Sequence, residues 1–199
     1  MASLKPYNKA IFLDRDGVIN VKLPEDKYVA RPSELELLPG VAEALQILRR
    51  LGYLLVVVTN QRGIGRGFMT LQDLNDVHDF MLRELGDSGA FIDALYHCPH
   101  DKSEGCPCRK PEPGLILEAS KDLRIDRAVS YTVGDSPSDV AAGRKAGTHT
   151  VLLGRERDEN SDLAFSTLLD FALYLQERED QRPDEEQAPK SGMGSSGND

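Results

Sequence analysis

The 199-residue chain contains no tryptophan, and aromatic residues make up only 6% of it. It also lacks a long hydrophobic run, because the longest one, around residues 53–58, is far too short to span a bilayer. The first ten residues contain no hydrophobic segment typical of a secretory signal. No block of lysine and arginine is present, which argues against electrostatic binding of long nucleic acids. We therefore expect a cytoplasmic monomer that binds neither membrane nor nucleic acid.

Negative charge is concentrated near the C-terminus. The formal net charge is -9, and residues 155–199 contain 5 basic and 12 acidic side chains. From residue 179 onward the sequence is rich in Asp, Glu, Gln and Pro, then in Ser and Gly, and offers almost nothing to bury. We interpret residues 179–199 as a disordered, solvated tail, with a regulatory docking role as the alternative, and residues 1–178 as a single domain.

Hydrophobic runs typical of strands alternate along the chain with helical patterns. Strands are predicted over residues 10–13, 53–58, 94–98, 128–133 and 150–153, and helices over 41–51, from Thr70 onward, 114–123, 138–146 and 163–175. The continuous apolar run at 53–58 is typical of a strand buried on both faces. Because parallel strands need crossover connections, this alternation predicts an α/β fold, a Rossmann-like three-layer α/β/α sandwich with a mainly parallel sheet.

Polar side chains follow three of the predicted strands. Asp14-Arg15-Asp16-Gly17 comes after the first strand, Thr59 after the second and Asp135 after a later one. Ligands bind at the carboxyl ends of parallel strands, so we expect these side chains to share one edge of the sheet. Carboxylates gathered there would repel one another without a divalent cation, and a set of oxygen ligands suits Mg²⁺. An aspartate can also attack phosphorus as a nucleophile.

Four motifs occur in order on these elements: IFLDRDGVIN, VVVTN, CRKP and VGDSPSD. Over about residues 8–155 the chain resembles the haloacid dehalogenase superfamily of phosphohydrolases. The resemblance implies that Asp14 is the nucleophile and that Asp16 is the general acid and base. Thr59 and Lys110 would stabilise the transferring phosphoryl group. The alternative is that Lys110 is an ordinary surface lysine and Thr59 an ordinary strand-end cap.

The same resemblance implies a catalytic Mg²⁺ ion. Its ligands would be Asp14, the backbone carbonyl of Asp16, and Asp135. Asp139, the second acid of the last motif, is expected to orient Lys110 or a metal-bound water.

All three cysteines lie within eleven residues, together with one histidine, in a loop over residues 97–109. Three thiolates and one imidazole make a Cys₃His set, the composition of a structural zinc site, so we expect Zn²⁺ bound by Cys98, His100, Cys106 and Cys108. The alternative is a redox-active or simply reduced cysteine loop. Arg109 and Lys110 follow directly, so the zinc would fix the loop that delivers both cations to the phosphate site. His78 and His149 are interpreted as structural.

The segments FLDRDGVIN, VVVTNQRGIGRG, YHCPH and CPCRKPEPG resemble the D-glycero-D-manno-heptose 1,7-bisphosphate phosphatases and the related histidinol-phosphate phosphatases. The resemblance implies a small phosphorylated sugar as substrate, with loss of the C7 phosphate; histidinol phosphate is the alternative. A non-catalytic phosphate-binding or partner-docking module is the alternative from another class. The expected substrate contacts are Arg15, Lys22, Asn60, Gln61 and Arg109. Only about forty residues separate Asp16 from Thr59, which leaves no room for a large cap domain.

Overall fold

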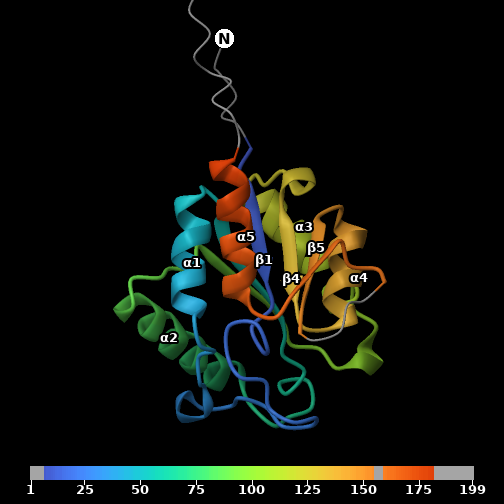
Figure 1. The fold of residues 1–199 in the computed structure, drawn as a ribbon. Coiled ribbons are helices and arrows are strands. Elements are labelled where there is room, and N and C mark those ends of the chain that lie inside the picture. The colour runs from blue at the N-terminus through green and yellow to red at the C-terminus, as the bar shows by residue number, and fades with distance from the viewer. Residues whose placement is uncertain (1–6, 155–158, 182–199) are drawn as a thin grey trace, which may run out of the picture.

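A computed structural model of the chain describes residues 7–154 and 159–181. Its centre is a six-stranded sheet in which every neighbouring pair of strands is parallel (Figure 1). The strands are β1 (Ala10–Leu13), β2 (Leu54–Asn60), β3 (Ala94–Cys98), β4 (Tyr131–Gly134), β5 (His149–Leu153) and β6 (Leu163–Phe165). Their order across the sheet is β3-β2-β1-β4-β5-β6. None of the described helices is long and apolar enough to cross a membrane.

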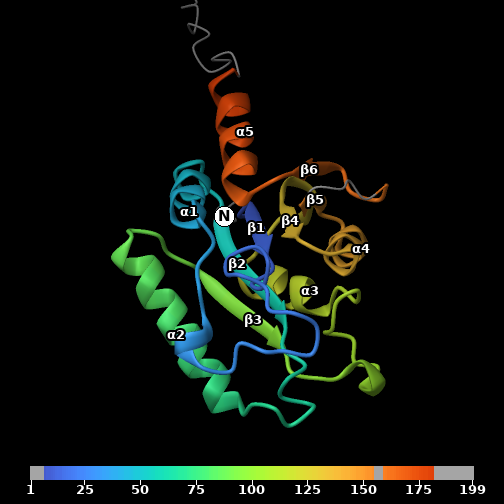
Figure 2. The ribbon, with the colours of Figure 1, turned by 60° about the horizontal axis from the view of Figure 1, so that its bottom comes forward.

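Within the described part of the chain, five α-helices cover the two faces of the sheet. They are α1 (Val41–Arg50), α2 (Leu71–Asp87), α3 (Gly114–Asp122), α4 (Pro137–Ala146) and α5 (Leu168–Asp180). The first two and the last pack on one face and share its hydrophobic core, with α1 against α5. Helices α3 and α4 pack on the other face, and Figure 2 shows α1 and α2 on the opposite side of the sheet from α3 and α4. The expected three-layer α/β/α sandwich is confirmed.

The central strands are buried on both faces. In β1, Ile11 and Leu13 belong to the core beneath α1, α2 and α5, whereas Ala10 and Phe12 belong to the core beneath α3 and α4. All four side chains are 0% exposed. A strand with an apolar layer above and below has no reason to alternate polar with apolar residues, which accounts for the continuous hydrophobic runs.

Two predicted elements need correction. Residues 163–165 were expected to begin the final helix, but they form β6, which pairs with β5. The helix instead begins after Thr167, whose side chain and that of Asp170 form a reciprocal capping box. The strand predicted from residue 128 begins at Tyr131, because Arg127–Val129 forms a 3₁₀ turn capped by Asp126.

The C-terminal end of the domain also differs from expectation. Helix α5 continues to Asp180, so the first two residues of the predicted tail are helical. Residues 182–199, which make up nearly all of that tail, lie outside the described residues.

The topology of the sheet indicates which of its edges binds ligands. Strand order reverses at β1, which has β2 on one side and β4 on the other, and ligands of doubly wound sheets bind beside such a point at the carboxyl ends of the strands. Those ends face the lower edge of Figure 1, where the long loop of residues 14–40 lies. This loop joins β1 to α1 and contains only a short 3₁₀ turn, Pro32–Glu34, so no cap domain is inserted there.

Candidate active site

The loop after β1 brings Asp14 and Asp16 to the carboxyl edge of the sheet. The backbone N–H of Asp14 donates to the carbonyl of Val133 in β4, at 3.0 Å, which fixes Asp14 between two strands. Gly17 then turns the chain with a φ of +90°, a conformation that L side chains rarely adopt. A Cβ atom at this position would also collide with the carboxylate of Asp135. Both the backbone conformation and the close approach therefore require glycine in the D-R-D-G motif.

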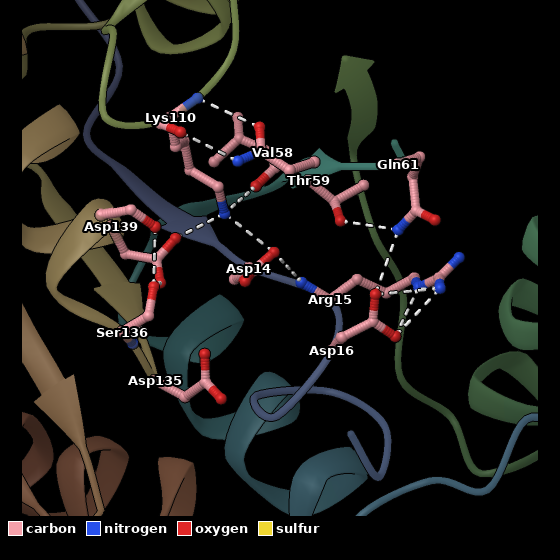
Figure 3. Close-up of polar contacts among 12 residues, drawn as sticks. Asp14, Arg15, Asp16, Val58, Thr59, Gln61, Lys110, Asp135, Ser136 and Asp139 are labelled. Carbon is pink, nitrogen blue, oxygen red and sulfur yellow. Dashed lines mark hydrogen bonds and ion pairs between the residues drawn. The ribbon is translucent and has the colours of Figure 1, made fainter. Parts of the chain in front are cut away.

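Lys110 is the centre of a buried ion network (Figure 3). Its Nζ lies 2.8 Å from Oδ1 of Asp14 and 2.5 Å from Oδ1 of Asp139, and it donates to the carbonyl of Val58 at 2.9 Å. The lysine side chain is only 3% exposed. Burial alone lowers the pKa of Lys110, but the carboxylates of Asp139 and Asp14 outweigh it and raise the pKa above its usual value. The ammonium group therefore stays charged beside Asp14.

Asn60, at the end of β2, aligns the backbone of Lys110. Its amide donates from Nδ2 to the carbonyl of Lys110 at 3.1 Å, and its Oδ1 accepts from the N–H of Lys110 at 3.0 Å. This two-point contact joins residues fifty positions apart, and it sets where the lysine side chain enters the site. Asn60, expected to contact substrate, thus also positions Lys110, and it lines the cavity as well.

Two further carboxylates follow β4, Asp135 in the loop and Asp139 in the first turn of α4, and they are bonded differently. Asp139 is nearly saturated: one oxygen pairs with Lys110, and the other accepts from the N–H and hydroxyl of Ser136 at 3.1 and 2.6 Å. Asp135 pairs through Oδ2 with Nζ of Lys22 at 2.6 Å, whereas its Oδ1 is buried and accepts no hydrogen bond among the described residues. Burial raises the pKa of Asp135, although Lys22 opposes that shift.

Three carboxylates meet in this part of the site. One oxygen each from Asp14, Asp135 and Asp139 lies within 4.8 Å of the others. Burial raises the pKa of Asp14 to about 7, with Lys110 acting in the opposite direction. Oxygen ligands in this arrangement, one of them a buried oxygen without a donor, fit a hard divalent cation such as Mg²⁺.

Asp16 is held by donors on every side. Nη2 of Arg15 lies 2.9 Å from Oδ1 and 3.0 Å from Oδ2 of Asp16, while Asn20 and Gln61 donate to one oxygen each at 3.0 and 3.1 Å. Burial raises the pKa of Asp16, but Arg15 and these amide donors outweigh it, so the pKa lies below its usual value. Nε2 of Gln61, which donates to Asp16, also donates to Oγ1 of Thr59 at 2.9 Å. Because this oxygen accepts from Gln61, the hydroxyl proton of Thr59 is free to donate elsewhere.

Some of these side chains line a cavity of about 420 Å³, namely Asp14, Asp16, Lys22, Asn60, Gln61 and Lys110. Its walls come from the loop over residues 22–29, from the end of β2 and from the cysteine-rich loop before Lys110. Asp14, Asp16 and Lys110 reach into it, and further cationic side chains line it: Lys22, Lys27, Arg62, Lys102 and Arg109. The cavity therefore has room and positive charge for an anionic ligand larger than phosphate.

The cysteine-rich loop forms a second cluster. Sγ of Cys108 lies 3.2 Å from Sγ of Cys98 and 3.3 Å from both Sγ of Cys106 and Nδ1 of His100. These separations exclude disulfides and approach the roughly 3.8 Å between ligand atoms around a tetrahedral zinc ion. Burial raises the pKa of the Cys98 thiol, so a bound cation is what would stabilise its thiolate. The four residues fit a closed Zn²⁺ site.

The structure brings together most of the side chains expected to carry chemistry. The exception is Arg15, whose proposed contact with substrate the structure does not support: the side chain is 1% exposed and turns toward Asp16 and His78, away from the cavity. Sequence reasoning missed three cationic lining residues, Lys27, Arg62 and Lys102. Lys102 could have been noticed because it lies inside the expected zinc loop. His78, interpreted from sequence as structural, lies on α2 with its Nε2 3.3 Å from Nη1 of Arg15.

Comparison with known proteins agrees with this architecture. Residues 7–147 match the haloacid dehalogenase-like hydrolase family. The chain is 39% identical to a D-glycero-beta-D-manno-heptose-1,7-bisphosphate 7-phosphatase of Haemophilus ducreyi, over 84% of this chain and 98% of that protein. It is 38% identical to a D-glycero-alpha-D-manno-heptose-1,7-bisphosphate 7-phosphatase of Campylobacter jejuni, over 86% of this chain and 98% of that protein.

A solved structure is similar over the same extent. The D,D-heptose 1,7-bisphosphate phosphatase from B. bronchiseptica, complexed with magnesium and phosphate, has a TM-score of 0.78 and 34% identity, covering 85% of this chain and 99% of that one. The family match spans most of the described residues, and the relatives align over almost their whole length. The chain therefore belongs to the haloacid dehalogenase-like hydrolase family and is one of its phosphatases.

Proposed function

We propose that this protein removes the C7 phosphate of D-glycero-D-manno-heptose 1,7-bisphosphate in an Mg²⁺-dependent reaction that passes through a phosphoaspartate at Asp14. The observation that carries the proposal is the position of Asp14. Its carboxylate lines a cation-rich cavity and is paired at 2.8 Å with the buried Lys110. The names of the similar proteins from Haemophilus ducreyi and Campylobacter jejuni support the choice of substrate.

In the first half of the reaction, an oxygen of Asp14 attacks phosphorus in line with the leaving oxygen. The bond from phosphorus to the sugar oxygen breaks as the new bond to Asp14 forms, and the sugar oxygen takes a proton from the Asp16 carboxyl group. This step uses the protonated form of Asp16, although Arg15 and the amide donors favour its carboxylate by lowering its pKa. Lys110 and the Thr59 hydroxyl donate to the oxygens of the transferring group, where negative charge is concentrated. The Thr59 proton is available for this because its oxygen accepts from Gln61.

In the second half, water attacks the phosphorus and releases Asp14. Asp16 left the first step as a carboxylate, so it accepts the proton of the attacking water and returns to its starting state. Arg15, Asn20 and Gln61 all donate to that carboxylate, and they stabilise the form that acts as a base.

Asp14, the backbone carbonyl of Asp16, and Asp135 would hold Mg²⁺. Asp135 is the better ligand of the two acids after β4, because its buried Oδ1 has neither a hydrogen bond nor an ion pair among the described residues, whereas Asp139 pairs through Oδ1 with Lys110 and accepts through Oδ2 from Ser136. Asp139 thus orients Lys110. When bound, the ion neutralises charge on the phosphoryl oxygens and on the carboxylates around them.

Zn²⁺ bound by the four-residue cluster would act structurally. Four protein ligands leave no open position for substrate or water, so the zinc would perform no chemistry. Its contribution lies in the loop, because Lys110 follows Cys108 by two residues and Arg109 donates to the carbonyl of His100 at 3.2 Å. The zinc would hold both cations in place.

The charges of the cavity favour a bisphosphate over histidinol phosphate. Lys27, Lys102 and Arg109 line it and form no ion pair among residues 7–154 and 159–181. A second phosphate would find partners there, and the planar fork of Arg109 suits a phosphate group. The amine of histidinol phosphate would be attracted to Glu25, but the three cations outnumber that carboxylate.

A substrate panel tests the proposal. Phosphate release would be measured with Mg²⁺ for both anomers of the heptose bisphosphate, histidinol phosphate, a nucleotide and p-nitrophenyl phosphate. We expect kcat/KM to be highest for one heptose anomer, and the substrate assignment fails if neither exceeds p-nitrophenyl phosphate. Asp14→Asn is the matched control, because it keeps the shape of the side chain and removes the nucleophile. Turnover that survives this change would refute the phosphoaspartate.

A further inference from the structure

We propose that Arg15 and His78 are positioning residues that orient Asp16 toward the leaving group. Proton transfer from Asp16 to the substrate then depends on two side chains that do not contact the substrate. The inference rests on the proposed function, since it assigns Asp16 the role of general acid. It goes further in giving a role to a histidine of α2 and in moving Arg15 from the substrate to the support of Asp16.

The first observation is the burial of Arg15. Its side chain is 1% exposed, and among the described residues its hydrogen bonds and ion pair go to Asp16 and His78. Nε and Nη2 both approach Oδ1 of Asp16, at 3.3 and 2.9 Å, and Nη2 also reaches Oδ2 at 3.0 Å. A planar guanidinium that contacts both oxygens fixes the plane of the carboxylate as well as its distance. Burying a charged arginine is costly, so its partner has to be an equally well-placed charge.

The second observation is that His78 anchors the far side of the guanidinium. Nη1 of Arg15 lies 3.3 Å from Nε2 of His78, which comes from α2, sixty-three positions away. A guanidinium can only donate, so Nε2 accepts and the imidazole is neutral with its proton on Nδ1. A carboxylate at this position would compete with Asp16 for the arginine. A neutral acceptor holds Arg15 in place and leaves its charge directed at Asp16.

The third observation is that the other two donors to Asp16 cannot replace the guanidinium group of Arg15. Asn20 and Gln61 each make a single hydrogen bond to Asp16, one to each oxygen. Each amide holds only one oxygen and is uncharged, so the two together restrain the carboxylate less firmly than the charged guanidinium does. Without Arg15, Asp16 therefore stays in the cavity but loses its fixed orientation toward the leaving oxygen.

The chemistry of the leaving group separates this role from general structural support. When the phosphorus–oxygen bond of a sugar phosphate breaks, the alkoxide needs the proton of Asp16, whereas p-nitrophenolate is stable enough to depart without one. Loss of the correct orientation of Asp16 should therefore lower the rate of the first step for alkyl phosphates and leave that rate unchanged for the aryl phosphate. Disturbing Asp14, Lys110 or the metal would slow both.

The experiment compares variants on the two kinds of substrate. Single-turnover rates would be measured for Arg15→Met, Arg15→Lys, His78→Leu and His78→Gln, using p-nitrophenyl phosphate and the alkyl phosphate that the wild type hydrolyses best. Thr148→Val is the control, because it removes a buried hydroxyl pair with Thr132 (2.7 Å), which this reaction does not use. We expect Arg15→Met to lower the alkyl rate about 100-fold, as for loss of general acid catalysis, and to change p-nitrophenolate release less than about threefold.

The other variants make the outcome decisive. Lysine offers one nitrogen in place of the Nε, Nη1 and Nη2 that contact Asp16 and His78, so Arg15→Lys should keep most of the alkyl defect. His78→Leu should lower the alkyl rate about tenfold, and His78→Gln, which keeps an acceptor, should restore most of it. Equal losses on both substrates, or none, overturn the proposal. If Arg15→Met does not fold by circular dichroism, the two His78 variants decide. A wild type without activity on any alkyl phosphate refutes the proposed function instead.

Discussion

Replacing Gly17 by alanine tests whether the glycine of the D-R-D-G motif serves the metal site. The residue has a φ of +90°, and an added Cβ would overlap the carboxylate of Asp135. The backbone strain costs about 1–2 kcal/mol, as for other L residues forced into left-handed conformations. The overlap adds a separate effect, because the carboxylate of Asp135 must move away from the position where it would hold Mg²⁺.

Gly147 offers a matched control at the distant end of α4. Its φ is +82°, and a Cβ there would meet nothing within 4 Å, so Gly147→Ala has the backbone strain without the collision. Both variants should lose about 1–2 kcal/mol of folding free energy, which lowers the melting temperature by roughly 2–8 °C for a chain of this size. Only Gly17→Ala should also lose metal affinity, by at least about tenfold, since it displaces a proposed ligand.

Two measurements check this reasoning. Thermal unfolding monitored by circular dichroism gives the strain, and the Mg²⁺ dependence of phosphate release gives the apparent metal affinity. The expected pattern is similar melting temperatures with different Mg²⁺ requirements. If Gly17→Ala saturates with Mg²⁺ at the same concentration as Gly147→Ala, Asp135 is not a metal ligand in the way proposed here.

Three further predictions concern other parts of the chain. Asn60→Ala removes two hydrogen bonds that align Lys110, worth about 1 kcal/mol each, so kcat should fall by up to roughly 30-fold in steady-state assays. Cys106→Ser should lower the zinc content from about one ion per chain to none in elemental analysis, and activity should fall with it; an unchanged zinc content would contradict the ligand set. Thr167→Ala breaks the capping box with Asp170 and should destabilise the fold by about 1 kcal/mol in denaturant unfolding, with kcat unchanged.

The order of strands and helices could be derived from sequence because each central strand is buried on both faces. Continuous apolar runs such as 54–58 then mark strands directly, and the helices between them show their buried stripe. The strand at the edge of the sheet was harder to predict. Strand β6 is short and only half-buried, so its three residues joined the apolar spacing of α5, and the capping pattern at Thr167 went unrecognised.

The candidate site, like the fold, could be predicted from the sequence only in part. Asp14, Asp16 and Asp135 follow predicted strands and could be selected along the chain on that ground, whereas Lys110 was selected because its CRKP motif resembles that of the haloacid dehalogenase superfamily. The direction in which each side chain points could not be predicted from the sequence. Arg15 lies between two cavity residues in sequence yet turns into the core, because an arginine there finds both a carboxylate and His78 of a distant helix. Sequence alone determined which groups the protein has for its chemistry, because local patterns encode strand ends. The tertiary structure decided which of them face the substrate and which hold the others, because that depends on contacts between residues tens of positions apart.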